Sequence, residues 1–384
     1  MLYNIMKILL LGEYSNLHNS LKQALLNMGH EVLLVGNGDG FKKYETDILI
    51  KSHLADYSLF NLIARLFMRI FKINIFDIEI YIRAKKILSK LRGFDVVQLI
   101  NENSFKTSPF LEIKLLKQIF KNNNNVFLLS CGVDSVSVKH AMSKKLKYSI
   151  LTPLFEDASL KKKYKPILKY DKENYIALGK FVQKNINGII SSDLDYHIPY
   201  LNKKKYLGMI PNPINTQKIK YYGINKSKKI SILHAINSSN KIKKGNRFFE
   251  EALKIIDEKF KDKISIITTY DLPYLEHLEN LKKCDILLDM VYAYDQGYNA
   301  LEAMAMGKIV FTGAEEEWLK LYNIKEDTVV INAVPNSMRI VEKLVWLIEN
   351  PSTLKSISIN ARKFIDKNHD FEKIATKYIK TWED

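Results

Sequence analysis

Cysteine is almost absent from this chain, whose 384 residues include only Cys131 and Cys284. Two thiols cannot form the disulfide framework of a small secreted protein or a zinc module built on cysteines. We interpret them as small buried thiols in a reducing compartment. Proline and glycine are also scarce, at 9 and 15 residues, which excludes collagen-like and linker-like sequences. The rest of the composition is that of a folded chain with room for two domains.

Long apolar segments are missing as well, since no run reaches the about 18 residues that a membrane-spanning helix needs. The apolar stretch at residues 6–11 is too short for a signal peptide, and no small-residue cleavage site follows it. We therefore expect a cytoplasmic protein.

Metal and cofactor motifs are absent too. The sequence has no HExxH zinc motif and no phosphate-binding P-loop. Asp193-Leu194-Asp195 has the letters of a DxD metal motif, but it lies between a predicted strand and a predicted helix, where an aspartate typically caps the helix. Of the three glycines in a GxGxxG dinucleotide fingerprint, only Gly12 is present after the first strand, so NAD binding is not expected. We expect no bound metal and no cofactor.

Acidic residues are outnumbered, with 42 Asp and Glu against 59 Lys and Arg, for a net charge of +17. Residues 1–212 hold 32 basic and 18 acidic residues, so they carry +14 of this excess. Net charge concerns partners rather than fold. One interpretation is a solvated lysine-rich surface, and the other is a first domain that sits on an anionic membrane, lipid phosphate or acidic glycan. The lysine clusters at 161–163 and 203–205 lack the aromatic and arginine pattern of a nucleic-acid module, so no nucleic-acid partner is expected.

Short apolar segments alternate with helical ones along the whole chain, which predicts an α/β protein with parallel sheets covered by helices. The pattern stops at Pro211 and Pro213, and a polar stretch follows. We expect one Rossmann-like domain at residues 1–212, a second at 213–368 and a last helix within 369–384. Ligands of such sheets bind at the carboxyl ends of the strands, so a cleft between the domains is the expected site. The predicted strands are residues 8–11, 31–35, 95–100, 126–130, 188–191, 206–210, 230–234, 264–268, 285–290, 308–311 and 328–331.

Residues 58–92 depart from this alternation. Phe60, Ile63, Leu66, Phe67 and Ile70 belong to a wide apolar face, and the segment is rich in arginine and lysine. An amphipathic helix that lies on a membrane surface has this pattern. The alternative is an ordinary core-facing helix followed by a loop.

The most informative segment is residues 294–310, which read Tyr-Asp-Gln-Gly-Tyr-Asn-Ala-Leu-Glu-Ala-Met-Ala-Met-Gly-Lys-Ile-Val. Gly297 lets backbone approach a ligand closely. The amides of a helix that starts near Asn299 attract phosphate oxygens. Glu302 can accept two hydrogen bonds from ribose hydroxyls. The alternative is a helix of small residues with an incidental glutamate.

A second segment, residues 234–245, follows a predicted strand and opens a helix. It reads His-Ala-Ile-Asn-Ser-Ser-Asn-Lys-Ile-Lys-Lys-Gly. Taken alone, it is typical of a solvated lysine-rich turn.

Together the two segments resemble the nucleotide-sugar signature of GT-B glycosyltransferases, especially the family-4 (glycosyltransferase group 1) retaining type of bacterial surface-glycan synthesis. The resemblance covers most of the chain and is strongest over residues 230–312 and 6–41. It implies two Rossmann-like domains facing across a cleft, with a C-terminal helix that crosses back to the first domain. It also implies transfer of a sugar from a nucleoside-diphosphate sugar to a hydroxyl of a glycan or lipid-linked glycan. The resemblance further implies retention at the anomeric carbon, catalysis without a bound metal ion, and action at the inner face of the cytoplasmic membrane.

The resemblance assigns residues to the donor. Lys241 and Lys244 stand where family members clamp the diphosphate, with Asn240 beside them, and such cations neutralise the charge of a leaving diphosphate. Glu302 would hold the ribose. The site residues expected at the donor sugar are Gly297, Gln296, Tyr298 and, from the first domain, Gly12.

The sequence also departs from the family pattern. The first glutamate of the signature is replaced by Tyr294, and Asp295 lies one place later, where it is a candidate catalytic substitute. Lys308-Ile309 stands in place of a residue followed by proline. Asp134, after the strand at 126–130, is a second catalytic candidate that would orient the acceptor or act as a base. Its alternative role is that of a helix cap.

Three other functions stay open. A nucleotide-sugar 2-epimerase of the same fold would alter the sugar without transferring it. A non-catalytic relative would bind nucleotide sugar or glycan without turnover. A basic module would bind anionic liposomes or RNA and ignore nucleotides.

Overall fold

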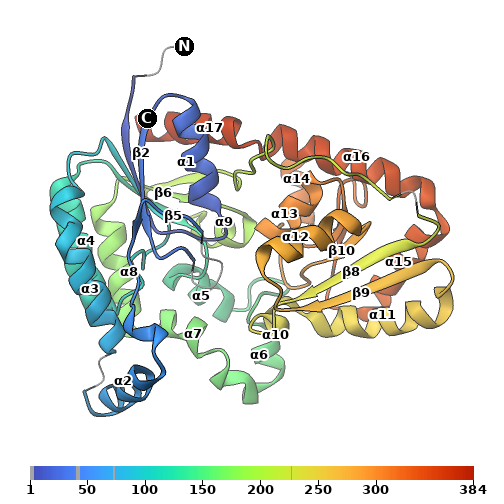
Figure 1. The fold of residues 1–384 in the computed structure, drawn as a ribbon, viewed down its shortest axis with the longest axis horizontal. Helices are drawn as coiled ribbons and strands as arrows, with labels where there is room; N and C mark the ends of the chain where they lie inside the picture. Colours follow the sequence, from blue (N-terminus) through green and yellow to red (C-terminus); the bar gives the residue numbers. More distant parts are fainter. Residues whose placement is uncertain (1–3, 40–43, 72–73, 226) are drawn as a thin grey trace.

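The computed structural model describes residues 4–39, 44–71, 74–225 and 227–384. The chain forms two parallel sheets, each covered by helices on both faces (Figure 1), so the predicted α/β class is confirmed. Residues 40–41, at the end of the N-terminal segment of the resemblance, lie outside the described residues. In the described part of the chain, no helix is long and apolar enough to cross a membrane.

The first sheet has seven strands in the order β3-β2-β1-β4-β5-β6-β7. The strand order reverses at β1, whose carboxyl end leads into Gly12. Both faces of β1 are buried, as a parallel strand between helical layers requires. The strands are β1 Lys7–Leu11, β2 Glu31–Gly36, β3 Ile48–Leu49, β4 Val96–Leu99, β5 Val126–Ser130, β6 Gly188–Ser191 and β7 Tyr206–Met209.

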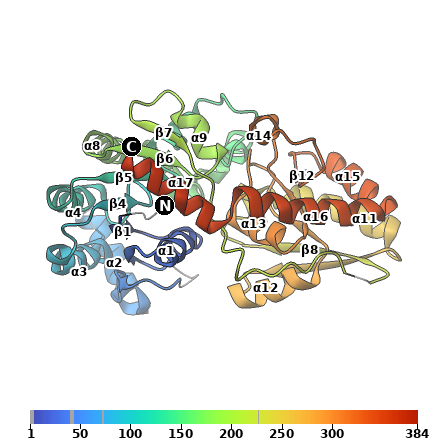
Figure 2. The same cartoon turned by 90° about the horizontal axis from the view of Figure 1, so that it is seen from above.

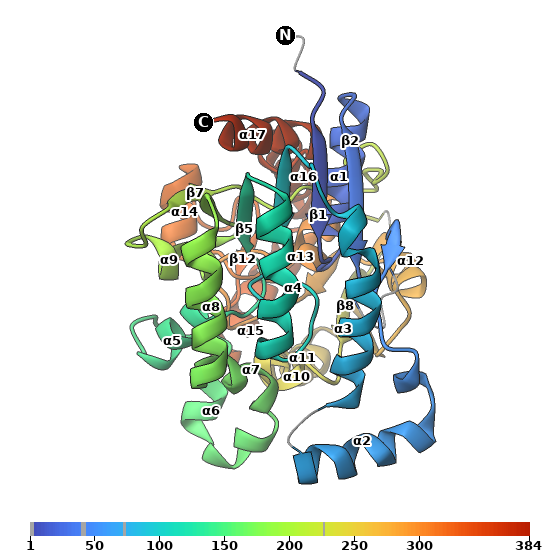
Figure 3. The same ribbon diagram turned by 90° about the vertical axis from the view of Figure 1, so that its left-hand side faces the viewer.

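Helices α3, α4 and α8 cover one face of this sheet, as Figure 3 shows, and α1 and α17 cover the other. Smaller helices follow the strands toward the second domain. The helices are α1 Leu17–Asn27, α2 Ser58–Phe71, α3 Ile75–Ile87, α4 Pro109–Asn122, α5 Ser135–Met142, α6 Thr152–Glu156, α7 Lys165–Leu168, α8 Glu173–Asn185 and α9 Leu194–Tyr200, with 3-10 turns η2 Leu54–Asp56, η3 Leu88–Lys90, η4 Ala158–Lys162 and η5 Lys169–Asp171.

The second sheet has five strands in the order β12-β11-β10-β8-β9. Helices α11 and α15 pack on one face, and α12, α13 and α16 pack on the other. The strands are β8 Ile230–Ile236, β9 Ile264–Tyr270, β10 Ile286–Leu288, β11 Ile309–Thr312 and β12 Ile331–Asn332, and the helices are α10 Lys241–Lys244, α11 Asn246–Phe260, α12 Tyr274–Lys283, α13 Tyr298–Ala305, α14 Glu316–Tyr322, α15 Ser337–Glu349 and α16 Pro351–Asn368.

The last helix, α17 Phe371–Glu383, leaves the second domain and lies on the first, next to α1 (Figure 2). Its buried side chains join the core of the first sheet. The Trp382 indole donates a 3.0 Å hydrogen bond to Gln98 on β4. The predicted crossing-back helix is therefore confirmed, whereas the boundaries at 212/213 and 368/369 stay predictions.

Candidate active site

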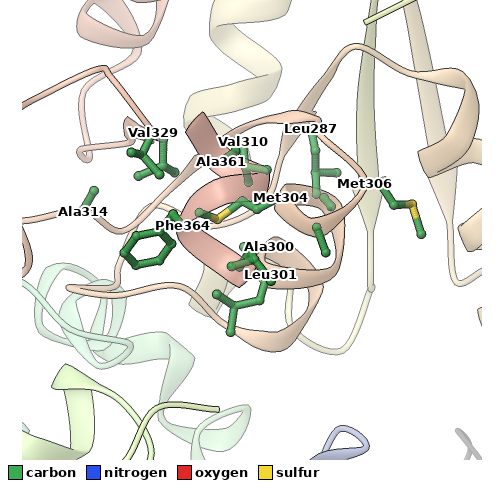
Figure 4. Close-up of a cluster of buried hydrophobic side chains, with 14 of the residues drawn as sticks. Leu287, Ala300, Leu301, Met304, Met306, Val310, Ala314, Val329, Ala361 and Phe364 are labelled. Carbon is green, nitrogen blue, oxygen red and sulfur yellow. The ribbon is translucent and has the colours of Figure 1, made fainter. Parts of the chain in front are cut away.

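Helix α13 starts beside open space. Gly297 is exposed and occupies the N-cap position, and no side chain caps the first amides. A Cβ atom added to Gly297 would meet no heavy atom within 4 Å. The apolar face of α13 is held by buried Ala300, Leu301 and Met304, which pack against α16 (Figure 4). Because the positive end of a helix attracts anions, this rigid start offers a place for phosphate oxygens.

A connected row of polar side chains runs along the start of α13. The Lys244 ammonium lies 2.7 Å from Oδ1 of Asp289, the residue that follows β10. The Asn299 amide donates to the same oxygen at 2.8 Å. The side-chain oxygen of Asn299 therefore faces His277, whose Nε2 lies 2.6 Å away and donates a hydrogen bond to it. Burial lowers the pKa of His277 more than this hydrogen bond raises it, so the ring is neutral at pH 7.

Glu302 lies one helical turn after Asn299, on the same side of α13. Its side chain is buried, and the Tyr274 hydroxyl donates a 2.6 Å hydrogen bond to Oε1. Tyr44 of the first domain packs edge-on against Tyr274, with ring centres 6.0 Å apart. Burial and the Glu302 charge raise the pKa of Tyr274, so its hydroxyl stays a donor. The structure thus places Glu302 next to the row of polar side chains that begins at Lys244. Its carboxylate is hydrogen-bonded to Tyr274, on which Tyr44 packs.

The two predicted diphosphate lysines point in different directions. Lys241 pairs with Glu250 on α11 at 2.7 Å, and this hydrogen bond raises the pKa of Lys241. Asn240 is the N-cap of α10 and makes no side-chain capping bond. Gly245 has φ +72°, and a Cβ there would lie 2.9 Å from Val291, so only glycine fits between α10 and the loop at 289–297.

Tyr294, at the position of the family's first glutamate, contacts the first domain. Its ring packs on Tyr148 with centres 5.7 Å apart, and its hydroxyl accepts from the Lys147 amide at 2.8 Å. The Glu315 carboxylate accepts from Lys147 Nζ at 2.8 Å and from the Tyr148 hydroxyl. Burial raises the pKa of Glu315, but hydrogen bonds from Asn332, Lys147 and Tyr148 together place it below its usual range. Tyr294 therefore forms part of the contact between the two domains.

Asp295 lies at the same interface. Its Oδ2 accepts from the Leu194 amide at 3.2 Å, and burial raises its pKa to about 6. Asp195 accepts from the Tyr294 amide at 3.1 Å, and burial raises its pKa to about 7. Asp193 caps α9 through the Tyr196 amide, as expected for the DxD letters. Within the described ranges, no group of three or more His, Cys, Asp or Glu side chains is arranged to hold a metal ion.

A cavity of about 160 Å³ lies between the first domain and the loop that precedes α13. Its polar wall includes Asp295, Gln296 and Gly297, and most of the remaining wall is apolar. Gln296 donates to the Gly313 carbonyl at 2.7 Å, while its buried Oε1 has no hydrogen-bond partner among the described residues. The apolar lining residues are Val133, Val138, Ala141, Leu146, Ile150, Leu151, Ile167, Pro199, Met290 and Ala293.

The structure gives Asp134 the role of a helix cap. The side chain is buried at the start of α5, and Oδ1 accepts from the amides of Val136 and Ser137 at 3.0 and 2.7 Å. Its Oδ2 accepts from the hydroxyls of Ser130 and Tyr200 at 2.7 and 2.9 Å. Because four donors occupy its two oxygens, we replace the predicted catalytic role with capping.

Gly12 and Tyr298, two further predicted donor residues, make contacts within the protein. Gly12 has φ +91°, and a Cβ there would lie 2.2 Å from Ile100, so glycine is required for packing on the neighbouring strand. The Tyr298 hydroxyl contacts Ser20 of α1 at 2.8 Å and the Pro213 carbonyl. Tyr298 therefore bridges the two domains.

Comparison with known proteins gives the fold. No protein-family model matches the chain, and a search of curated proteins found no relative. The structure of HepE from Anabaena with UDP and glucose is similar over 98% of this chain and 99% of that one, at 12% identity and a TM-score of 0.60. Sucrose-phosphate synthase from Thermosynechococcus elongatus matches over 98% of both chains, at 13% identity and a TM-score of 0.60. The chain has the GT-B fold.

A third similar structure is a putative UDP-N-acetylglucosamine 2-epimerase from Listeria monocytogenes. It matches over 98% of this chain and 95% of that one, at 12% identity and a TM-score of 0.55. The same fold thus occurs in proteins that are named a synthase and an epimerase.

Asp289, Tyr274 and His277 were not among the residues predicted from the sequence. Asp289 had a signal, because an acidic residue at the carboxyl end of a parallel strand faces the ligand edge of the sheet. The predicted strand at 285–290 ran past it, whereas β10 ends at Leu288. Tyr274 and His277 lie on α12 without any local motif.

Proposed function

We propose that this protein is a glycosyltransferase that moves a sugar from a nucleoside-diphosphate sugar to an acceptor hydroxyl. The observation that carries the proposal is the Lys244–Asp289–Asn299 row at the start of α13, with Glu302 one turn further, inside a GT-B fold. A cation, free helix amides and a carboxylate in this order match the diphosphate and ribose of one ligand.

Lys244 and the first amides of α13 bind the diphosphate in this proposal. Lys244 is held by Asp289, so its charge is already oriented at the helix start. Lys241 is a second cation that joins after release from Glu250, with Asn240 beside it. The ribose hydroxyls reach Glu302 by taking the place of the Tyr274 hydroxyl, and the donor sugar lies beside Gly297 and Gln296. The UDP bound to HepE makes UDP the first nucleotide to test.

The acceptor enters from the first domain through the cavity that Asp295 and Gln296 line. The bond between the anomeric carbon and the diphosphate breaks, and a new bond forms between that carbon and the acceptor oxygen. Lys244 stabilises the charge that grows on the diphosphate. Asp295, whose pKa is raised by burial to about 6, accepts the acceptor's proton. Retention requires the acceptor oxygen to attack the face of the sugar from which the diphosphate leaves. Retention, independence from metal ions and a glycan or lipid-linked acceptor follow the resemblance to family-4 enzymes.

An epimerase is the second candidate, favoured by the similarity to the Listeria protein. It alters the sugar of the free nucleotide sugar and needs no acceptor. A third candidate is a non-catalytic binder, favoured by Tyr294 in place of the family's glutamate.

The deciding experiment measures nucleotide binding and then turnover. Calorimetry with UDP, GDP and their glucose conjugates identifies the nucleotide. Mass spectrometry follows sugar transfer with and without added glycan or glycolipid, and NMR spectroscopy detects a change of configuration in the donor sugar. Glu302→Gln should weaken nucleotide binding at least tenfold, whereas Glu276→Gln, at an exposed position of α12, should leave it unchanged. Equal affinity of the Glu302 variant and the wild type would refute the ribose role. Epimerisation of the donor sugar in the absence of acceptor would identify an epimerase. Nucleotide binding without any turnover would identify a non-catalytic binder.

A further inference from the structure

Helix α2 stands away from the body of the first domain (Figure 3) and packs on η2 and the start of α3. Of its described side chains, Ala64 is the buried one. Ile70 is 69% exposed and Leu66 is 49% exposed. The core-facing alternative for α2 was therefore wrong, although α3, in the same segment, does face the core. The exposed large apolar side chains of α2 are Ile63, Leu66, Phe67, Met68 and Ile70.

Four of these side chains, those of Ile63, Leu66, Phe67 and Ile70, form one apolar face of α2, and Met68 lies on another side of the helix. Ile63, Leu66 and Ile70 follow helical spacing on a single side of α2. Arg65 and Arg69 are exposed on the polar side of α2, away from this face, and the sequence has no acidic residue at positions 57–76. An apolar face with a cationic polar side is the pattern of a helix that lies in the interface of an anionic bilayer.

An apolar groove lies on α3, η2 and the edge strand β3, and α2 packs on the first two of these elements. Its volume is about 530 Å³. Ile82 and Leu49, both about half exposed, lie along it. Lys86 is a cation of its wall, and Arg83 in the same wall pairs with Glu79 at 2.9 Å. The groove is lined by Ile48, Leu49, Ile50, Leu54, Ile75, Ile78, Glu79, Ile82, Arg83, Lys86 and Ile87.

We propose that α2 and this groove form a docking surface for an anionic lipid bilayer. Helix α2 lies in the headgroup region with its apolar face toward the acyl chains, and the groove makes a second apolar contact. Charge complementarity selects the bilayer, because residues 1–212 carry a net charge of +14. A second copy docked on this surface would bring two basic helices without acidic residues together at the cost of repulsion. The inference is independent of the proposed sugar transfer.

The test is vesicle flotation of the full chain, with phosphatidylcholine vesicles that contain or lack 30% phosphatidylglycerol as the probe. Wild-type protein should float with the anionic vesicles, and the bound fraction should fall when salt is raised, since salt screens exposed charges. The combined Leu66→Asp and Ile70→Asp variant should bind at least tenfold more weakly. Arg65→Gln with Arg69→Gln should lose several-fold affinity for anionic vesicles alone. Ile82→Asp should weaken binding through the groove.

The matched control is Leu321→Asp with Met338→Asp, which changes exposed apolar residues of the second domain. It should bind like the wild type, and circular dichroism should show that every variant stays folded. Absence of wild-type flotation, or equal loss in the control, would overturn the proposal. Light scattering gives a further outcome: a dimer that the Leu66 and Ile70 variant dissociates, with vesicle binding unchanged, would assign the surface to a second copy. Wild-type binding of the Ile82→Asp variant to anionic vesicles would show that the groove is not part of the docking surface.

Discussion

The Tyr274 hydroxyl donates a 2.6 Å hydrogen bond to Glu302, and this bond links α12 to the buried face of α13 beside the domain interface. The carboxylate that we assign to ribose is thus occupied by a side chain of its own domain. A ligand hydroxyl competes with Tyr274 for Oε1, so the bond lowers the apparent affinity for nucleotide.

Tyr274→Phe is therefore expected to strengthen nucleotide binding. The ring and its packing on Tyr44 stay in place, while the competing hydroxyl is lost. A hydrogen bond of this kind contributes about 1 kcal/mol, which corresponds to an affinity gain of roughly five-fold. Calorimetry with UDP measures it. Weaker binding in the Tyr274 variant would mean that its hydroxyl contacts the ligand directly.

Lys244 and Lys241 are expected to differ as diphosphate ligands. Lys244→Met should weaken binding of UDP at least tenfold, or about 1.4 kcal/mol, and leave uridine binding unchanged, because the charge acts on the diphosphate. Lys241→Met should have a smaller effect, since this side chain is exposed and paired with Glu250. Titrations of both variants with UDP and uridine separate the two roles. A Lys244 variant that loses both ligands equally would point to a folding defect, which the uridine titration reveals.

Ionisation of Asp295 is expected to determine how kcat/KM falls at acidic pH. As a base it works when ionised, and burial raises its pKa to about 6. The value of kcat/KM should therefore rise as pH increases through 6 and level off above 7. Asp295→Asn should lower the plateau by at least a hundredfold, which is within the range that general-base groups contribute. A variant that keeps the wild-type pH profile would remove Asp295 from the reaction.

Glu13 is expected to make stability depend on pH. It is buried after β1, its Oε1 has no hydrogen-bond partner among the described residues, and burial raises its pKa to about 8. The folded chain holds this proton more tightly than the unfolded chain, so the contribution is full below pH 4.5 and is lost as pH rises toward 8. Over that window the free energy of unfolding of the wild type should fall relative to Glu13→Gln, by at most about 1.4 kcal/mol per pH unit.

Urea denaturation at pH 5 to 8 measures this difference, with Glu31→Gln, at an exposed position of β2, as the control. A constant difference between wild type and the Glu13 variant would show that the carboxyl group does not titrate in this range.

The sequence by itself determined the α/β architecture and the donor-like segments. Alternating apolar runs specify parallel strands, and residues 294–310 place Glu302 one turn after Asn299 whatever the rest of the chain does.

Tertiary structure alone decided what these side chains touch. Lys241 and Lys244 are three residues apart, yet one meets Glu250 and the other Asp289, because different elements pack on each side of α10. Asp134 and Asp295 both looked catalytic, but Asp134 has its oxygens filled by neighbouring donors and Asp295 borders a cavity. Asp289 comes from a strand end 45 residues beyond Lys244 in the chain, and the exposure of α2 depends on which elements leave its face uncovered. Local patterns indicate a helix cap or an apolar helix face, but they do not show what packs against it.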